Sequence, residues 1–384
     1  MSFPLVSLGD FVEIARNGIS PEKIQRGTNY VGLENIDGSG NFVDVKGVDA
    51  GELASSKLLF TQKQVLFGKL RPYLKKIARP DFDGICSTDI LPLLPSKEID
   101  RDYLFHTLRR QSFVDDVSSL SSGANLPRIS PKVLSEMQIP LPPLKEQRRI
   151  ATILDKADAL RAQRRAAIAK LDDLLQSVFI AMFGDPMANP KGWPIRKIAD
   201  LLESVKYGSS DKATQEGEIP ILRMNNLTYS GQIELTELKY ITAKQADEKY
   251  LVEPGDILFN RTNSKELVGK TAVYDGPIPM AYAGYLVRGR VNQSNAPEYI
   301  SAFLNSIWGK AILRNMCKNI VGMANINARE FGSIELPVPP SELQRKYQFY
   351  VRAVRAQKQR MQGGMKKLDE LFASLQQRAF SGKL

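Results

Sequence analysis

Apolar residues recur along this chain with two different spacings, which predict two kinds of element. Short apolar runs bounded by Gly, Asn and Pro predict strands at 65–67, 220–224 and 257–259. Apolar residues at helical spacing, with Asp or Pro near the start, predict helices over 100–117 and 297–315. Because strands and helices do not alternate regularly, the pattern indicates an α/β (α+β) fold.

Two longer segments, 145–182 and 341–380, carry apolar residues at steps of three and four and predict two long helices. An exposed apolar seam needs a partner, and the simplest partner is the other helix. Packing of each helix on its own globular part is the alternative. Gln357 and the Gly363–Gly364 pair interrupt the second seam and are expected to weaken or bend that helix, by ~1 kcal/mol per Gly. The two predicted seams are Ile150, Ile153, Ala157, Leu160, Arg164, Ala167, Leu171, Leu174, Val178 and Ala181, and Tyr347, Tyr350, Val354, Gln357, Met361, Gly364, Leu368, Leu371, Leu375 and Arg378.

The chain repeats itself once, with an offset that drifts upward from 190 to 197 as small insertions would produce. The matching pairs keep their order: 5–18 with 195–208, 30–42 with 221–233, 65–69 with 257–261, 139–148 with 336–345, and 170–175 with 367–372. We therefore predict a pseudo-two-fold internal repeat of one unit, a globular part followed by a helix. The predicted boundaries are 1–143 and 185–340 for the globular domains, and 144–184 and 341–384 for the helices.

Charge indicates a polyanionic partner. The 53 Lys and Arg residues exceed the 42 Asp and Glu residues, giving a net charge of +11. The two long helices carry most of this surplus, which favours nucleic acid over a membrane surface, although a charged helix face is often simply solvated. Two cysteines and the single histidine, His106, argue against disulfide frameworks, zinc clusters and histidine triads. With no signal peptide and no long apolar run, a cytoplasmic protein without a membrane span is expected.

No convincing catalytic motif is present, so we expect no catalytic residue, metal or cofactor in this chain. The Gly-Lys-Thr at 269–271 lacks the upstream Gly of a phosphate-binding loop, because Ser264 stands at that position. The Phe-Gly-Asp-Pro at 183–186 lacks the aromatic end of a methyltransferase motif and is typical of a helix stop. His106 is expected to pack in its helix or lie on its surface.

Polar, basic segments occupy equivalent places in the two repeats, at 68–76 and 260–265. They differ sharply although the preceding strands agree, as two readers of different targets would. A second pair lies at 122–128 and 322–327. Arg matches guanine, Asn matches adenine, and Lys, Ser and Thr match phosphates or base edges. Solvated loops and plain turns are the alternatives. The candidate DNA-binding residues are Lys69, Arg71, Tyr73, Lys75, Lys76, Arg128, Arg223, Asn260, Arg261, Thr262, Asn263, Lys265 and Asn325.

The duplicated motifs resemble those of the specificity subunit of type I restriction-modification systems. The resemblance rests on IPLPPLKEQRRIATILDKADAL and LPVPPSELQRK, on the helix ends KLDDLLQSVFIAMFGD and KLDELFASLQQRAFSGKL, and on VLFGKLRPYLKK and GDILFNRTNS. It covers the whole length in the right order. It implies two similar target-recognition domains that each read one part of a bipartite DNA sequence. It also implies that the two long helices pair as an antiparallel coiled coil and act as a spacer.

The resemblance implies a non-catalytic subunit that binds double-stranded DNA, two modification (methyltransferase) subunits and two restriction (translocase and nuclease) subunits. S-adenosylmethionine, ATP and Mg would then belong to those partners and not to this chain. Two other classes of protein remain as alternatives. One is a non-catalytic coiled-coil scaffold that does not bind DNA, and the other is a fused enzyme such as a methyltransferase or a nuclease.

Overall fold

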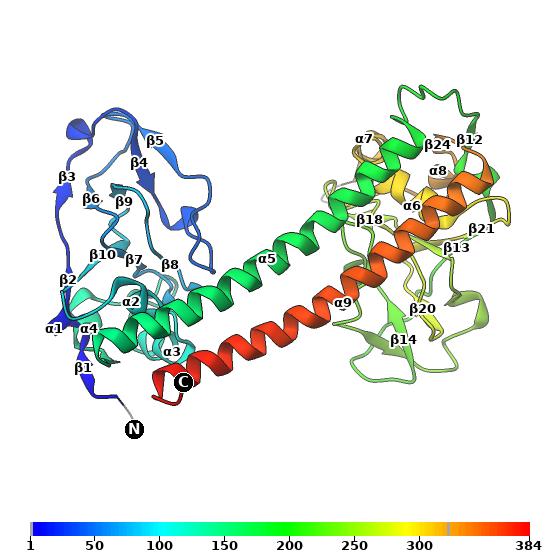
Figure 1. The fold of residues 1–384 in the computed structure, drawn as a ribbon. Coiled ribbons are helices and arrows are strands. Elements are labelled where there is room, and N and C mark those ends of the chain that lie inside the picture. The colour runs from blue at the N-terminus through cyan, green and yellow to red at the C-terminus, as the bar shows by residue number, and fades with distance from the viewer. Residues whose placement is uncertain (1–2, 321–322) are drawn as a thin grey trace. The chain divides into compact units, whose positions relative to one another are not determined.

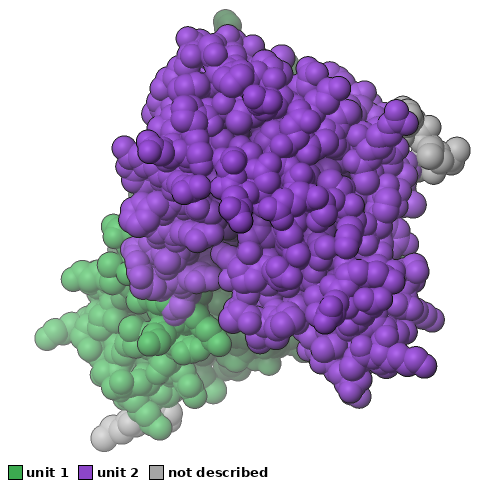
Figure 2. Space-filling model, turned by 90° about the vertical axis from the view of Figure 1, so that its right-hand side faces the viewer, with its two compact units in different colours: residues 1–164, 364–384 green, residues 165–363 purple. Residues whose placement is uncertain are grey.

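The computed structural model describes residues 3–320 and 323–384 and contains two compact units (Figures 1 and 2). Unit 1 comprises 1–164 and 364–384, and unit 2 comprises 165–363. Each unit therefore contains one globular part, one half of the long helix α5 and one half of the long helix α9. None of the helices within the described residues is both long and apolar enough to cross a membrane.

Unit 1 is built mostly from short strands, and apart from the short α1 its α-helices come late in the globular part. Its elements are β1 (Leu5–Ser7), α1 (Leu8–Phe11), β2 (Val12–Ile14), β3 (Gly18–Ile19), η1 (Pro21–Lys23), β4 (Thr28–Val31), η2 (Leu33–Asn35), β5 (Lys46–Val48), β6 (Lys57–Phe60), β7 (Val65–Gly68), η3 (Pro72–Leu74), β8 (Ile77–Ala78), β9 (Gly84–Cys86), β10 (Ile90–Pro95), α2 (Arg101–Leu108), α3 (Gln111–Ser119), α4 (Pro131–Glu136), β11 (Gln138–Pro140) and the first part of α5 (Leu144–Phe183).

Unit 2 follows the same order with small insertions. Its elements are β12 (Ile195–Lys197), η4 (Ile198–Leu201), β13 (Leu202–Tyr207), β14 (Ile219–Leu222), η5 (Met224–Asn226), β15 (Lys239–Ile241), η6 (Glu248–Tyr250), β16 (Leu251–Val252), β17 (Ile257–Asn260), β18 (Thr262–Asn263), β19 (Thr271–Val273), β20 (Met280–Tyr282), β21 (Leu286–Val291), α6 (Pro297–Asn305), α7 (Ile307–Met316), β22 (Lys318–Ile320), β23 (Met323–Asn325), α8 (Ala328–Gly332), β24 (Glu335–Pro337) and the first part of α9 (Ser341–Phe380).

One four-stranded antiparallel sheet corresponds strand for strand between the two units, whereas the other large sheet has five strands in unit 1 and four in unit 2. The order of the corresponding sheet is β2-β10-β7-β8 in unit 1 and β13-β21-β17-β19 in unit 2. The register also corresponds, because Ile90 pairs with Gly68 in unit 1 and Leu286 pairs with Asn260 in unit 2. The predicted mixed α/β class and the predicted repeat are therefore confirmed.

A buried tyrosine and a buried glutamine fix the start of each long helix in the same way. Tyr103 donates a hydrogen bond to the carbonyl oxygen of Pro140, and its counterpart Tyr299 bonds to Pro337. Gln147 is 1% exposed, donates to the Pro142 carbonyl oxygen at 2.8 Å and accepts from the Asp100 amide at 2.7 Å. Since Pro142 and Pro143 have no amide hydrogen to offer, the glutamine side chain ties this Pro-rich turn to α2.

Gln344 repeats these contacts in unit 2. It donates to the Pro339 carbonyl oxygen at 2.8 Å and accepts from the Ala296 amide at 2.9 Å. The recurring Pro-Pro and Gln of the sequence motif are therefore structural, because they set where the helix leaves the globular part. This junction explains why the motif is duplicated.

The long helices pair antiparallel within each unit, as predicted. In unit 1, Arg161 forms an ion pair with Asp369 at 2.6 Å, while residues nearer the start of α5 share a core with Phe380. In unit 2, Lys358 forms an ion pair with Asp172 at 2.7 Å. The two ion pairs are equivalent by the repeat, since both aspartates belong to the Lys-Leu-Asp motif.

The predicted seams are only partly buried. Leu160, Leu174 and Leu371 are 56%, 46% and 53% exposed. The outer ends of the helices instead pack on the globular cores, through residues such as Leu154 in unit 1 and Phe183 in unit 2. Both suggested partners of the helices are therefore present, the other helix in the middle and the globular part at the ends.

Two expectations about local structure were wrong. The segments 100–117 and 297–315 each form two helices, because the chain turns at Arg110 and at Ser306, whose hydroxyl caps α7 by accepting from the Gly309 amide. The strand at 220–224 ends at Leu222, after which η5 begins. The glycine pair does not end the second long helix: α9 runs unbroken through Gly363 and Gly364, because packing supports the helix, and the expected weakening at this pair stays a prediction.

Candidate nucleic-acid interface

Three polar side chains lie together where the central strands of unit 1 end. Lys69 directly follows β7, and its amide donates to the carbonyl oxygen of Asp89, the residue before β10, at 2.9 Å. The Lys69 carbonyl oxygen accepts from the amide of Ile129 at 3.1 Å, which places Arg128 beside it. We call Lys69, Asp89 and Arg128 the first polar trio.

Charge pairs connect the members of the first polar trio. The Arg128 guanidinium donates to both Asp89 carboxylate oxygens, at 3.1 and 3.3 Å, and the Lys69 ammonium lies 3.9 Å from one of them. The hydrogen bonds to Asp89 raise the pKa of Arg128 above its usual value. The trio therefore gathers the donors of two cations around one carboxylate, and all three side chains remain partly exposed.

Two further predicted residues flank this trio. Arg71 adopts a left-handed backbone conformation with φ of 50°, and its amide donates to the Pro127 carbonyl oxygen at 2.8 Å. Its guanidinium reaches the Asn125 carbonyl oxygen at 3.3 Å. Tyr73 is 54% exposed. The structure thus brings the predicted segments 68–76 and 122–128 side by side.

The side chains of Lys75 and Lys76 both donate hydrogen bonds to other residues of unit 1. The Lys75 ammonium donates to the Gln111 side-chain oxygen at 2.5 Å, and burial, followed by the nearby charge of Arg109, lowers its pKa. The Lys76 ammonium donates to the Ile36 carbonyl oxygen. Lys270 of unit 2 makes the same kind of bond, to the carbonyl oxygen of Met224 at 2.8 Å. Lys76 in unit 1 and Lys270 in unit 2 therefore occupy equivalent places. Each lysine links its β-hairpin to an earlier 3₁₀ turn, which is η2 in unit 1 and η5 in unit 2.

Unit 2 carries a second polar trio, Arg261, Tyr285 and Asn325, at the equivalent place. The Arg261 amide donates to the Tyr285 carbonyl oxygen at 3.0 Å, and the Arg261 carbonyl oxygen accepts from the amide of Ile326 at 2.9 Å. These are the same two backbone hydrogen bonds as in unit 1. The Arg261 guanidinium lies over the ring of Tyr207, 4.9 Å from its centroid, and its buried Nε atom has no partner among the described residues.

The other predicted residues near Arg261 differ in their contacts and in their burial. Thr262 pairs with Asn325 across β18 and β23, and its hydroxyl donates to the Asn325 side chain at 3.4 Å. Asn263 is half-buried and accepts from the amide of the next residue at 2.9 Å, while Lys265 is exposed. Asn260 is completely buried.

Arg223 lies elsewhere in unit 2, where its guanidinium donates to the Glu237 carbonyl oxygen at 3.0 Å. Gly322, the first residue of the predicted segment 322–327, lies outside the described residues. The sequence-based search missed Asp89, Tyr285 and Tyr207. The repeat contained a signal for the first two, because they are 196 positions apart and directly precede equivalent strands.

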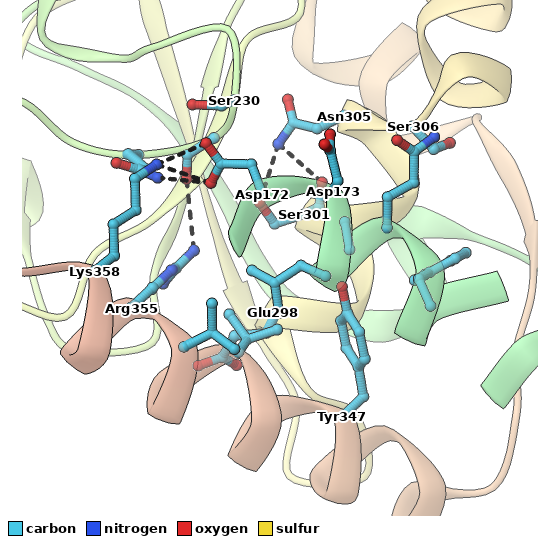
Figure 3. A pocket seen from close by; sticks show the side chains of 18 of the residues that line it. Asp172, Asp173, Ser230, Glu298, Ser301, Asn305, Ser306, Tyr347, Arg355 and Lys358 are labelled. Carbon is cyan, nitrogen blue, oxygen red and sulfur yellow. Dashed lines mark hydrogen bonds and ion pairs between the residues drawn. The ribbon is translucent and has the colours of Figure 1, made fainter. Parts of the chain in front are cut away.

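Unit 2 also contains a cavity of about 490 Å³ between α6 and the paired helix halves (Figure 3). Two carboxylates on its wall are paired: Asp172 with Lys358 at 2.7 Å, and Glu298 with Arg352 at 2.9 Å. The lining also includes the aromatic ring of Tyr347.

The two repeats differ at one residue of the cavity wall. Asn305 on α6 donates to the Thr271 carbonyl oxygen at 2.6 Å. The equivalent residue of unit 1 is Arg109, whose longer side chain reaches the carbonyl oxygens of Ile77 and Gly38 at 3.3 and 3.1 Å and lies over the ring of Phe105.

The histidine, the cysteine and the Gly-Lys-Thr segment considered in the sequence lie in environments that fit a structural role. His106 is buried and its Nε2 lies 2.8 Å from an Asp155 carboxylate oxygen. Burial raises the pKa of the Cys86 thiol to about 12. In the Gly-Lys-Thr segment, Gly269 has φ of +78° and accepts a hydrogen bond from Lys310 at 3.0 Å, so its carbonyl is already occupied. No cluster of three potential metal-ligating residues occurs in the part of the chain that the structure describes.

Comparison with known proteins identifies the family. The model of the type I restriction modification DNA specificity domain matches residues 3–170 and again 190–369. The chain therefore belongs to this family and carries two copies of its domain. The predicted DNA-specificity function is confirmed over the alternative of a coiled-coil scaffold that does not bind DNA.

Similar proteins carry matching names. The EcoKI specificity subunit of Escherichia coli is 26% identical over 314 residues, covering 76% of this chain and 67% of that protein. The EcoDI specificity subunit of Escherichia coli is 36% identical over 135 residues, which are 34% of this chain and 30% of that protein. The chain therefore spans about two thirds of the first relative and less than one third of the second.

Solved structures agree on the fold. One, from work titled "Structural basis underlying complex assembly and conformational transition of the type I R-M system", has a TM-score of 0.61 and 22% identity, covering 100% of this chain and 98% of the other. The type I restriction-modification S subunit from M. genitalium has a TM-score of 0.59 and 14% identity, covering 98% and 96%. At these identities the likeness supports the architecture alone.

Proposed function

We propose that this chain is the specificity subunit of a type I restriction-modification complex and that each unit reads one part of a bipartite DNA sequence. The observation that carries the proposal is the repeat itself. The two units share strands, register and backbone hydrogen bonds, but they present different polar side chains at the same edge. A scaffold used twice with different side chains suits two targets, because base edges are read by side-chain donors and acceptors.

The chemistry of the complex would then belong to other subunits. We expect two modification subunits, which bind S-adenosylmethionine, and two restriction subunits, which use ATP and Mg, with this chain in the cytoplasm and without a cofactor of its own. The name of the family and the names of the relatives support this assignment. The polar trios support it as well, since they combine donors and acceptors suited to base edges and contain no nucleophile paired with a base.

The paired helices offer a surface for two equal partners. Leu174 in unit 2 and Leu371 in unit 1 are equivalent by the repeat, and both are about half exposed. A leucine exposed at the same place in both units gives the paired helices two matching apolar positions. Two equivalent sites suit two copies of one modification subunit.

The test is to produce the chain with the modification subunits and to map the methylated positions of a genome. We expect one bipartite sequence with a fixed gap. Arg71→Ala should relax the first half-site only and Arg261→Ala the second only, each at a cost of ~1–3 kcal/mol if the arginine contacts a guanine. Equal loss of specificity in both half-sites would contradict separate reading by the two units.

A further inference from the structure

The two polar trios occupy the same place in their units, although their side chains differ at every position. Lys69 corresponds to Arg261, Asp89 to Tyr285, and Arg128 to Asn325. Two backbone hydrogen bonds define the place in each unit, one between the ends of the central strands and one to the residue after the third member. The backbone is therefore the constant part of this edge, and the three side chains are the variable part.

The central strands that hold the first two members of each trio are buried in both units. All residues of β7 and β17 are buried, and β10 and β21 begin with buried residues. Side chains attached to the ends of such strands are placed more accurately than side chains on free loops. A trio on this support is suited to hydrogen bonding in one fixed arrangement.

We infer that the two polar trios are the base-reading positions of the two units, an inference that rests on the proposed function. In the first trio, Arg128 and Lys69 provide donors and Asp89 provides an acceptor between them. The major-groove edge of a G·C pair shows two acceptors on guanine and one donor, the N4 amino group, on cytosine. Arg128 or Lys69 therefore binds guanine while Asp89 accepts from the cytosine amino group.

The second trio offers a different set of hydrogen-bonding groups. Arg261 lies over Tyr207, which restrains the guanidinium for a contact with guanine. Asn325 has the side chain that pairs with the N6 and N7 edge of adenine. Tyr285 is about half exposed and adds an aromatic face and a hydroxyl. The second half-site therefore contains both a guanine and an adenine within reach of this edge, whereas the first is read through a G·C pair.

The ion pairs of the first trio have a role beyond stability. The side chains of Lys69, Asp89 and Arg128 are 24%, 26% and 42% exposed, and partly solvated ion pairs add little to folding. The Asp89 carboxylate instead holds both cations in place before DNA binds. Replacing Asp89 by Asn keeps the shape and the backbone contacts but removes this charge and one of the acceptor oxygens.

The experiment uses the chain in complex with its modification subunits and compares Asp89→Asn with Tyr285→Ala. For each variant, methylated positions are mapped, and binding is measured on DNA duplexes that carry every single-base change in one half-site. Asp89→Asn should reduce discrimination at one G·C pair of the first half-site by about tenfold or more, with the second half-site unchanged. Tyr285→Ala should do the converse. Asp81→Asn is the matched control, because it removes an exposed carboxylate from the same unit, and it should change neither half-site.

The outcomes distinguish a failure of the inference about the two polar trios from a failure of the proposed function. If the wild-type complex recognises a bipartite site but Asp89→Asn and Tyr285→Ala retain its full discrimination, the trios are not the base-reading positions and the inference is wrong. If the wild-type complex shows no sequence preference, the proposed function itself fails. Thermal unfolding of each variant shows whether it is folded. Should Tyr285→Ala unfold, Tyr285→Phe, which removes only the hydroxyl, replaces it.

Discussion

Removal of the buried glutamine side chain at the start of α5 should loosen the junction between the helix and its globular part. Gln147→Ala deletes three hydrogen bonds at once: from the Asp100 amide at 2.7 Å, to the Glu98 carbonyl oxygen at 2.9 Å and to the Pro142 carbonyl oxygen at 2.8 Å. The Gln147 side chain is buried, with an exposed fraction of 1%. Its three partners would therefore lose their hydrogen bonds inside the protein.

The magnitude follows from the number of bonds. Each buried hydrogen bond contributes ~0.5–1.5 kcal/mol, and a partner left unpaired adds a desolvation cost. Alanine recovers only a few tenths of a kcal/mol through its higher helix propensity. We therefore expect Gln147→Ala to lower the free energy of unfolding of unit 1 by about 3 kcal/mol. Gln344→Ala should do the same for unit 2, where the Ala296 amide loses its acceptor.

Hydrogen exchange measured by mass spectrometry, together with urea unfolding, tests this expectation. In Gln147→Ala, the amide of Asp100 should exchange faster while peptides of unit 2 keep their protection. Gln163→Ala makes the same change at an exposed position of the same helix and should have almost no effect. A loss below about 1 kcal/mol for Gln147→Ala, or unaltered exchange at Asp100, would refute the proposed role of the glutamine.

Four further outcomes are expected. Although burial raises the pKa of Asp155, hydrogen bonds from His106 and Arg79 outweigh it and hold that pKa at about 2, below the ordinary 3.8. The stabilisation by the ionised Asp155 is therefore complete above about pH 4 and disappears as the pH falls toward 2. In urea unfolding, Asp155→Asn should lower the free energy of unfolding by about 1 kcal/mol at pH 7, after allowance for solvent screening, and should change it little at pH 2. Replacing Gly363 and Gly364 by Ala should stabilise α9 by ~0.5–1 kcal/mol each and raise the melting temperature, because the nearest described atom to either added methyl group is 3.8 Å away; an unchanged or lower temperature would contradict this. If ~6–10 phosphates are neutralised, log K for DNA should fall with log salt at about −0.9 per contact, whereas a flat response would exclude phosphate contacts as the main source of affinity. Four residues inserted after Ala166, with four at the equivalent position of α9, would lengthen the helices by ~6 Å and should widen the gap between methylated half-sites by one or two base pairs; an unchanged gap in an active variant would show that helix length does not set it.

The sequence alone determined the architecture at the level of elements. The duplicated motifs predicted two similar units, and the long runs of apolar residues at steps of three and four predicted both 40-residue helices nearly to their ends. These features are local or periodic, so they can be recognised without knowledge of the fold. The duplicated Lys-Leu-Asp motif also contained the interhelical ion pairs, although only the structure shows that Asp172 and Asp369 face cations on the other helix.

Only the tertiary structure decided which polar residues form the candidate interface. Residues 69, 89 and 128 are distant in the sequence. Antiparallel pairing brings the end of β7 to the start of β10, and the hydrogen bond from the Ile129 amide to the Lys69 carbonyl oxygen adds residue 128. The same folding directs Lys76 inward to a backbone carbonyl group, although its sequence neighbours resemble DNA-binding residues. Composition shows that a segment is basic, but the direction of each side chain depends on long-range strand pairing. For this reason the basic segments could be located from the sequence. The repeat makes Asp89 and Tyr285 equivalent positions, but the fold was needed to place them beside the basic residues.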